Sequence, residues 1–90
     1  MTRNGKCVLI TGASRGIGAA LAVAFAKEGY SFVGINYSSD IGGAESVAKK
    51  VRELGAKAQI YCCDVSEPGK CEEMLETFIK DAGKIDVLVN

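Results

Sequence analysis

The sequence has no excess of charge of either sign, because 11 lysine and arginine residues balance 11 aspartate and glutamate residues over 90 positions. It therefore offers no broad basic field that would attract nucleic acid or an anionic membrane surface. No stretch approaches the roughly 18 apolar residues that a membrane-spanning helix needs. The first residues also lack the apolar core of a signal peptide and the arginine-rich character of a transit peptide. We expect a cytoplasmic protein without nucleic-acid or membrane partners.

Histidine is absent as well, and the four cysteines (Cys7, Cys62, Cys63 and Cys71) show no C-x-x-C spacing. A metal or redox site is one interpretation of these cysteines, but we favour small buried apolar residues in a reducing compartment. Cys62 and Cys63 are neighbours in a predicted strand, so their side chains point to opposite faces and cannot easily act as a pair. We therefore predict no metal site.

What the sequence does contain is an alternation of short β-branched runs and longer helical stripes, in a globular composition with 48% hydrophobic residues. Strands are predicted over residues 6–10, 31–36, 58–63 and 85–90. Three helices are predicted between the strands, each with one apolar face. The first face consists of Ile17, Ala20, Leu21, Ala24 and Phe25, and the second of Ala44, Val47, Ala48, Val51 and Leu54. The third consists of Cys71, Met74, Leu75, Phe78, Ile79 and Ala82. Strands joined by helices imply an α/β fold with a parallel sheet and right-handed crossovers.

The most informative segment is residues 11–18, Thr-Gly-Ala-Ser-Arg-Gly-Ile-Gly, between the first predicted strand and the first predicted helix. Gly12 permits a tight turn, Gly16 lets the backbone approach a phosphate, and Gly18 lets the helix pack closely against the strand. In Rossmann folds a dinucleotide pyrophosphate rests here, on the N–H groups of a helix N-terminus. The alternative is a glycine-rich turn without a ligand. The Rossmann interpretation predicts the strand order 3-2-1-4 and helices on both faces of the sheet.

Three segments resemble motifs of the short-chain dehydrogenase/reductase family. Residues 11–18 look like its cofactor loop, Asp64-Val65 resembles its adenine-contacting aspartate, and residues 86–90 look like the start of its Asn-Asn-Ala-Gly segment. The resemblance implies that residues 1–90 are the N-terminal part of a single Rossmann dinucleotide-binding domain. It implies cofactor contacts from Gly12, Ser14, Arg15, Gly16, Ile17, Gly18, Asn36, Tyr37, Ser38, Asp64, Val65 and Asn90.

The loop is most similar to that of 3-oxoacyl-[acyl-carrier-protein] reductases and related ketoreductases. The resemblance thus implies an NADPH-dependent oxidoreductase that reduces a ketone, such as a 3-oxoacyl thioester, to the alcohol. It also implies a homotetramer for the full-length protein. Asn90 has a structural role in the family, where it helps to hold the sheet.

The residues at the end of the second predicted strand favour NADP(H) over NAD(H). NAD-binding Rossmann proteins usually place an acid there for the ribose 2′-hydroxyl, but this position falls on Asn36 or Tyr37. Arg15 offers a fixed charge and a fork of donors that suits a 2′-phosphate, and Ser38 could donate a further hydrogen bond. On this interpretation Asn36→Asp would shift the preference towards NADH. A solvated surface charge is the alternative for Arg15.

Asp64 and Ser14 each have two possible roles. Asp64 falls at the carboxyl end of a strand, where ligands bind, but an aspartate there is often only a turn or cap residue. Ser14 is expected either to bond a phosphate or to cap the helix.

By resemblance, catalysis in the family uses a serine and a Tyr-x-x-x-Lys pair. Tyr30, Tyr37 and Tyr61 are not followed four residues later by lysine, so no catalytic residue is assigned among residues 1–90. We expect the catalytic part to lie outside this sequence. The alternative is a non-catalytic nucleotide-binding fragment or a split subunit that needs a partner chain.

Overall fold

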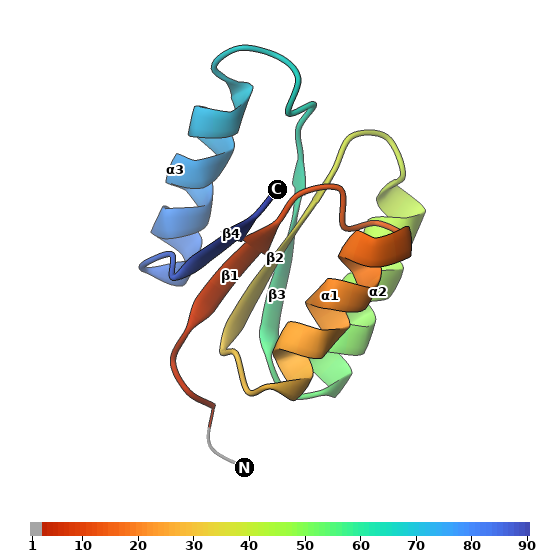
Figure 1. Ribbon diagram of the computed structural model, residues 1–90, viewed down its shortest axis with the longest axis vertical. Helices are drawn as coiled ribbons and strands as arrows, with labels where there is room; N and C mark the ends of the chain where they lie inside the picture. Colours follow the sequence, from red (N-terminus) through yellow and green to blue (C-terminus); the bar gives the residue numbers. More distant parts are fainter. Residues whose placement is uncertain (1–2) are drawn as a thin grey trace.

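The structure is a computed structural model, and it describes residues 3–90. Strands and helices alternate along the chain in the order expected from the sequence (Figure 1). They are β1 (Cys7–Ile10), α1 (Gly16–Lys27), β2 (Phe32–Tyr37), α2 (Ile41–Glu53), β3 (Lys57–Cys62), α3 (Lys70–Ala82) and β4 (Val87–Val89). The predicted strand boundaries differ from these by a few residues at most, and the largest difference is at β4.

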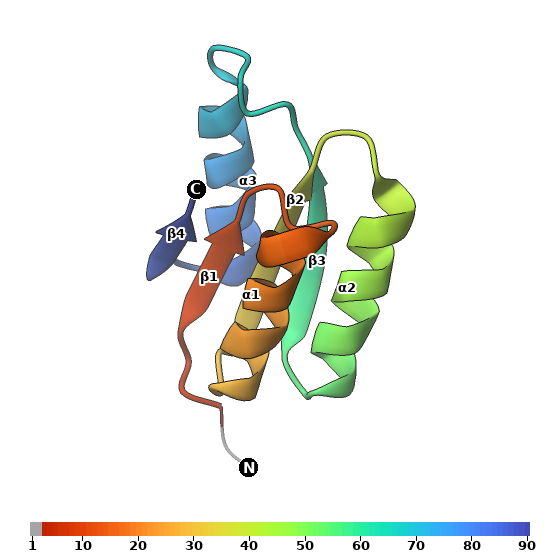
Figure 2. The same cartoon turned by 45° about the vertical axis from the view of Figure 1, so that its right-hand side comes forward.

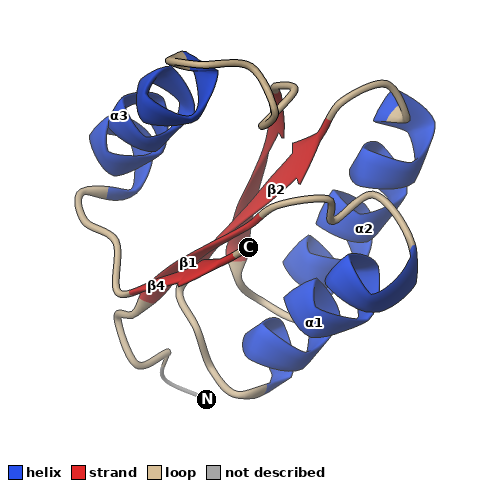
Figure 3. Ribbon diagram, turned by 45° about the horizontal axis from the view of Figure 1, so that its top comes forward, coloured by secondary structure: helices blue, strands red, loops and turns tan. Residues whose placement is uncertain are grey.

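The four strands form one parallel sheet in the order β3-β2-β1-β4, which confirms the Rossmann arrangement. In the centre, Val8 of β1 is paired with Val33 of β2 on one side and with Val87 of β4 on the other. Helices α1 and α2 cover one face of the sheet and α3 covers the other, as Figures 2 and 3 show from two directions. The carboxyl ends of the strands therefore meet at one edge, where ligands bind in open α/β sheets.

Both faces of β1 are buried, and its side chains alternate between two apolar clusters. Val8 and Ile10 belong to the cluster under α1 and α2, whereas Cys7 and Leu9 belong to the cluster under α3. A central parallel strand that is covered on both sides needs this unbroken apolar character. The second cluster is centred on Phe78 of α3, which is fully buried.

The predicted face of α2 is confirmed except at Leu54, which is exposed. The predicted face of α1 is confirmed only at Leu21 and Phe25, which are partly buried against the same core cluster. The buried residues of α2 are Ala44, Val47, Ala48 and Val51. In α1 the buried residues are Ala22 and Ala26, while Ile17 is 82% exposed and Ala20 and Ala24 are exposed too. Lys27 is the only charged residue of α1, so the spacing of apolar residues could not distinguish its faces.

The expectation of four buried cysteines is also wrong, because only Cys7 is buried. Cys62 is exposed, Cys63 and Cys71 are half-buried, and all four thiols are free. Cys62 and Cys63 follow the strand alternation: Cys63 packs on the cluster under α3, whereas the Cys62 thiol contacts the Ser38 carbonyl oxygen at 3.6 Å.

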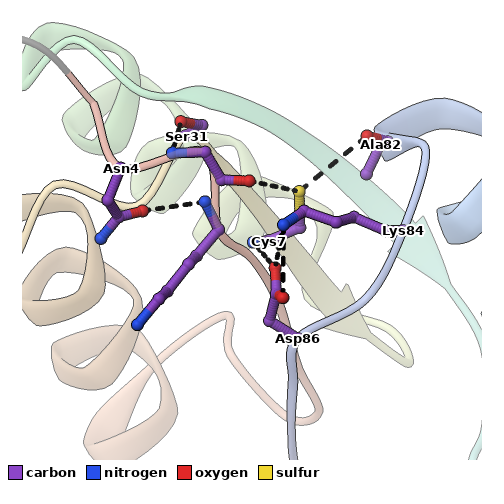
Figure 4. Close-up of polar contacts among 8 residues, drawn as sticks. Asn4, Cys7, Ser31, Ala82, Lys84 and Asp86 are labelled. Atoms are coloured by element: carbon purple, nitrogen blue, oxygen red, sulfur yellow. Dashed lines mark hydrogen bonds and ion pairs between the residues drawn. The ribbon is translucent and has the colours of Figure 1, made fainter.

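A polar clasp joins β1 to the segment before β4, at the amino end of the sheet (Figure 4). The Cys7 N–H donates to Asp86 Oδ2 at 2.7 Å, and the Asp86 N–H donates to the Cys7 carbonyl oxygen at 2.9 Å. Lys84 forms an ion pair with the same carboxylate at 3.2 Å. The hydrogen bond from the Cys7 N–H is the main reason that the pKa of Asp86 lies below its ordinary value. This clasp lies at the opposite end of β1 from the glycine-rich loop.

Candidate cofactor-binding site

The glycine-rich loop leaves the carboxyl end of β1 and leads into the first turn of α1 (Figures 1 and 2). Gly12 and Gly16 have φ angles of +59° and +65°, in the left-handed region that favours glycine. A Cβ added at either residue would meet no other atom within 4 Å. The backbone at both positions therefore faces open space, and these residues fit the close approach of a ligand.

The N-terminus of α1 has no side-chain cap within residues 3–90. Arg15 occupies the N-cap position in an extended conformation, makes no capping hydrogen bond, and is followed by a first turn without an acidic residue. By contrast, α2 is capped by Asp40, which accepts a hydrogen bond from the Gly43 N–H at 2.9 Å. The first N–H groups of a helix have no partner in the helix itself and carry partial positive charge. The start of α1 thus has the features that bind the oxygens of a phosphate.

Ser14 and Arg15 lie directly before the first residue of α1. Ser14 is half-buried, and no hydrogen bond from its hydroxyl to α1 is present in the described part of the chain. Arg15 is exposed, and neither of the two ion pairs found among residues 3–90 includes it. Neither side chain is thus committed to a protein partner within this range. The loop also packs on α2, since a Cβ at Gly43 would lie 2.5 Å from the Ser14 carbonyl oxygen.

Asn36 lies in β2 beside the loop, with its side chain directed into the protein. Its exposure is 2%, and it is the one buried polar or charged residue among residues 3–90. Its Oδ1 atom accepts a hydrogen bond from the Gly12 N–H at 3.1 Å, and its carbonyl oxygen accepts from the Ala13 N–H at 2.8 Å. Its Nδ2 atom donates to the carbonyl oxygens of Tyr61 and Cys63, both at 3.1 Å. These contacts could not be predicted from the sequence.

Tyr37 and Ser38 lie at the carboxyl end of β2, next to Asn36. Tyr37 is the last residue of the strand and is 8% exposed, whereas Ser38 begins the following turn and is exposed. None of residues 36–38 at this end of β2 is acidic. Of the residues predicted here, Ser38 is the one whose side chain is open to solvent.

Asp64 and Val65 follow β3 and are exposed. The Asp64 Oδ1 atom accepts hydrogen bonds from the Ser66 N–H at 3.0 Å and from the Ser66 hydroxyl at 2.6 Å. These bonds lower the pKa of the Asp64 carboxyl. The structure thus shows the turn role that the sequence left open for Asp64, while adenine contact stays a prediction. Val65 is 42% exposed at the same edge of the sheet.

Thr11 connects the loop to the end of β4, a contact that the sequence motif did not reveal. Its N–H and its hydroxyl both donate to the Val89 carbonyl oxygen, at 2.9 and 3.2 Å, and its hydroxyl also lies 3.4 Å from Asn90 Oδ1. These contacts agree with a structural role for Asn90. Gly12, Asn36, Asp64 and Asn90 therefore all lie at or just beyond the carboxyl ends of the strands.

A family model described as short chain dehydrogenase matches residues 6–90. The chain belongs to the short-chain dehydrogenase family. It is 42% identical over 86 residues to an uncharacterized oxidoreductase of Methylorubrum extorquens, which covers 96% of this chain and 34% of that protein. It is 36% identical over 85 residues to the 3-oxoacyl-[acyl-carrier-protein] reductase FabG of Staphylococcus epidermidis, which covers 94% of this chain and 34% of that protein. The chain thus spans about a third of the length of these short-chain dehydrogenase relatives.

Solved structures of similar proteins hold either nicotinamide cofactor. A putative dehydrogenase from Burkholderia cenocepacia with bound NADP has a TM-score of 0.88 and 32% identity, over 92% of this chain and 32% of that one. An NADH-dependent reductase complexed with NAD has a TM-score of 0.86 and 34% identity, over 96% of this chain and 35% of that one. These short-chain dehydrogenase folds therefore do not by themselves decide between the two cofactors.

Residues 3–90 include no group of three or more histidine, cysteine, aspartate or glutamate side chains that could hold a metal ion. Within the same range, no helix combines the length and the apolar character needed to cross a membrane.

Proposed function

We propose that this chain forms the cofactor-binding part of an NADP(H)-dependent short-chain dehydrogenase/reductase. The observation that carries the proposal is the N-terminus of α1, which has no side-chain cap among the described residues and begins at Gly16. Gly16 and Gly12 both have left-handed backbone conformations with open space beside them. The N–H groups of this turn would hold the pyrophosphate, with the Ser14 hydroxyl as a further donor. Ile17, Val65 and Asn90 lie around the same edge of the sheet and would contact other parts of the dinucleotide.

The preference for NADP(H) rests on charge at two places. Arg15 is exposed at the start of α1 and pairs with no carboxylate among the described residues, so its guanidinium is available to a 2′-phosphate. At the end of β2, Tyr37 and Ser38 occupy the position where NAD-binding proteins usually have an acidic residue. An acidic side chain there would repel the 2′-phosphate, and neither residue carries a charge that does so. Asp64, beyond β3, would contact the adenine through the carboxylate oxygen that Ser66 does not use.

The reaction that we propose is reduction of a ketone, such as a 3-oxoacyl thioester, to the alcohol. The bound nicotinamide would supply the hydride. The residues of this chain bind and orient the cofactor, whereas the family's serine, tyrosine and lysine would supply proton transfer from outside this sequence. Resemblance to 3-oxoacyl-[acyl-carrier-protein] reductases supports this substrate class, and a homotetramer is proposed for the whole protein on the same ground. We propose a cytoplasmic location because the first residues lack the character of a signal or transit peptide.

A calorimetric titration of the purified full-length protein with NADPH and with NADH tests cofactor binding directly. We expect NADPH to bind at least about ten-fold more tightly, since a charge-assisted hydrogen bond contributes about 1.5–3 kcal/mol. Turnover is then followed by loss of NADPH absorbance with a 3-oxoacyl thioester. Absence of binding to either cofactor would refute the proposal, whereas tighter binding of NADH would refute only the cofactor preference.

A further inference from the structure

Asn36 connects two parts of the candidate site that are separate in the sequence. Its Oδ1 atom and carbonyl oxygen hold the N–H groups of Gly12 and Ala13, at 3.1 and 2.8 Å. Its Nδ2 atom holds the carbonyl oxygens of Tyr61 and Cys63, at the end of β3 and directly before Asp64. We name these four hydrogen bonds the Asn36 bridge.

The bridge acts on a residue that has no side chain of its own to pack. Gly12 has a positive φ angle and open space beside it, so its position depends on its hydrogen bonds and on the backbone contact with Gly18. A buried amide that satisfies both its acceptor and its donor is strongly directional, because any shift of the loop leaves a buried polar group unpaired. Asn36 therefore determines where the glycine loop lies relative to the end of β3.

We infer that Asn36 is a positioning residue for the cofactor site and does not itself select between NADPH and NADH. This inference rests on the proposed function. An exposure of 2% leaves the Asn36 side chain almost no surface to offer a ribose or a 2′-phosphate, and its amide is already bonded to backbone groups. The bridge holds the pyrophosphate-binding loop at a set distance from the Asp64 turn, and a dinucleotide must reach both.

The substitution Asn36→Asp distinguishes positioning from cofactor selection. A carboxylate would still accept the Gly12 N–H, but its second oxygen would face the carbonyl oxygens of Tyr61 and Cys63, where the amide now donates. The carboxylate oxygen and the two carbonyl oxygens would all be hydrogen-bond acceptors without a donor between them. Because this arrangement is unfavourable at a buried position, we expect the loop to shift away from the end of β3. If Asn36 instead touched the ribose, an aspartate there would bond the 2′-hydroxyl of NADH and repel the phosphate of NADPH.

The first arm of the test measures the Kd of NADPH and of NADH for the full-length wild-type protein, Asn36→Asp and Ser38→Asp. Ser38→Asp places the same charge on the exposed residue two positions further on. We expect Asn36→Asp to raise both Kd values by about ten-fold or more and to keep their ratio, while Ser38→Asp moves the ratio towards NADH. A selective loss of NADPH binding in Asn36→Asp, with NADH binding retained, would overturn the inference.

The second arm needs no cofactor and uses a milder variant, Asn36→Ser, whose shorter side chain does not reach the loop. Amide hydrogen exchange is compared at Gly12 and at Ile35, an amide in the same strand as Asn36. We expect exchange at Gly12 to accelerate by about ten-fold or more relative to Ile35. Equal exchange at Gly12 in variant and wild type would show that the bridge does not hold the loop. If wild type binds neither cofactor, the proposed function fails, but this arm still decides whether Asn36 positions the loop.

Discussion

Gly18 in the first turn of α1 lies directly against Gly12 of the loop. A Cβ at Gly18 would overlap the Gly12 carbonyl oxygen and would lie 2.9 Å from Ala13 Cα. The neighbours are backbone atoms and cannot rotate away as a side chain could. The first turn of α1 and the loop therefore form one unit, and the position of the N–H groups in that turn follows from this contact.

We predict that Gly18→Ala weakens binding of both cofactors and destabilises the protein by about 1–3 kcal/mol, because the added methyl group forces the helix away from the loop. Gly42→Ala is a matched control in α2, where an added Cβ meets nothing within 4 Å and φ is not positive. The control should keep cofactor binding and should leave stability unchanged or raise it by about 0.5–1 kcal/mol. Urea unfolding and cofactor titration measure the two effects, and similar results for both variants would contradict the prediction.

Gly34 in the centre of β2 has a different neighbour, the ring of Phe78. A Cβ at Gly34 would lie 2.6 Å from Phe78 Cε1 and 2.8 Å from Leu9 Cδ1, inside the cluster under α3. We predict that Gly34→Ala destabilises the protein by about 1–3 kcal/mol. The double variant Gly34→Ala with Phe78→Leu should be less destabilised than the sum of the two single variants, because the smaller side chain makes room. A double-mutant cycle in urea tests this, and strict additivity would mean that the two residues do not compete for space.

The Asp86 clasp should make stability depend on pH. Its carboxyl has a folded-state pKa below the ordinary value of 3.8, chiefly because it accepts the Cys7 N–H. A lowered pKa means that the ionised carboxylate stabilises the fold above the unfolded-state pKa, and that this contribution is lost as the pH falls through the folded-state pKa. We predict that Asp86→Asn reduces the loss of stability between about pH 5 and about pH 2.

Unfolding midpoints over this pH range, for wild type, Asp86→Asn and the exposed-residue control Glu76→Gln, measure the effect. The control should follow the wild-type curve. A curve for Asp86→Asn that coincides with that of wild type would show that the clasp does not titrate with folding.

The parts of the fold that the sequence predicted correctly are those where apolar and polar residues alternate clearly. In α2 the spacing identified Ala44, Val47, Ala48, Val51 and Leu54 as the buried face, and the structure confirms all of them but Leu54, which is 37% exposed. In α1 nearly all residues are apolar or glycine, so the same method selected Ile17, which is 82% exposed. In α1 the buried face consists of the small residues that fit between the sheet and α2. Which residues these are depends on contacts between segments that are distant in the sequence.

The candidate site shows the same division between local and long-range information. The glycine loop could be located because the roles of Gly12, Gly16 and Gly18 depend on local backbone geometry. The position of the Asn36 side chain could not, because the side chain bonds Gly12 of the loop, Tyr61 of β3 and Cys63, the residue after β3. The sequence pattern around a polar residue at a strand end is the same whether its side chain points into the protein or towards a ligand.

We propose that Arg15, at the start of α1, gives this site its preference for NADP(H). The most direct test is the Kd of NADPH and of NADH for Arg15→Ala, with Lys27→Ala, which removes the same charge from the last turn of α1, as the matched control. We predict that Arg15→Ala raises the NADPH Kd by about ten-fold or more and leaves the NADH Kd within about two-fold, while Lys27→Ala changes neither. An equal loss of both cofactors in Arg15→Ala, or no loss of either, would contradict the account.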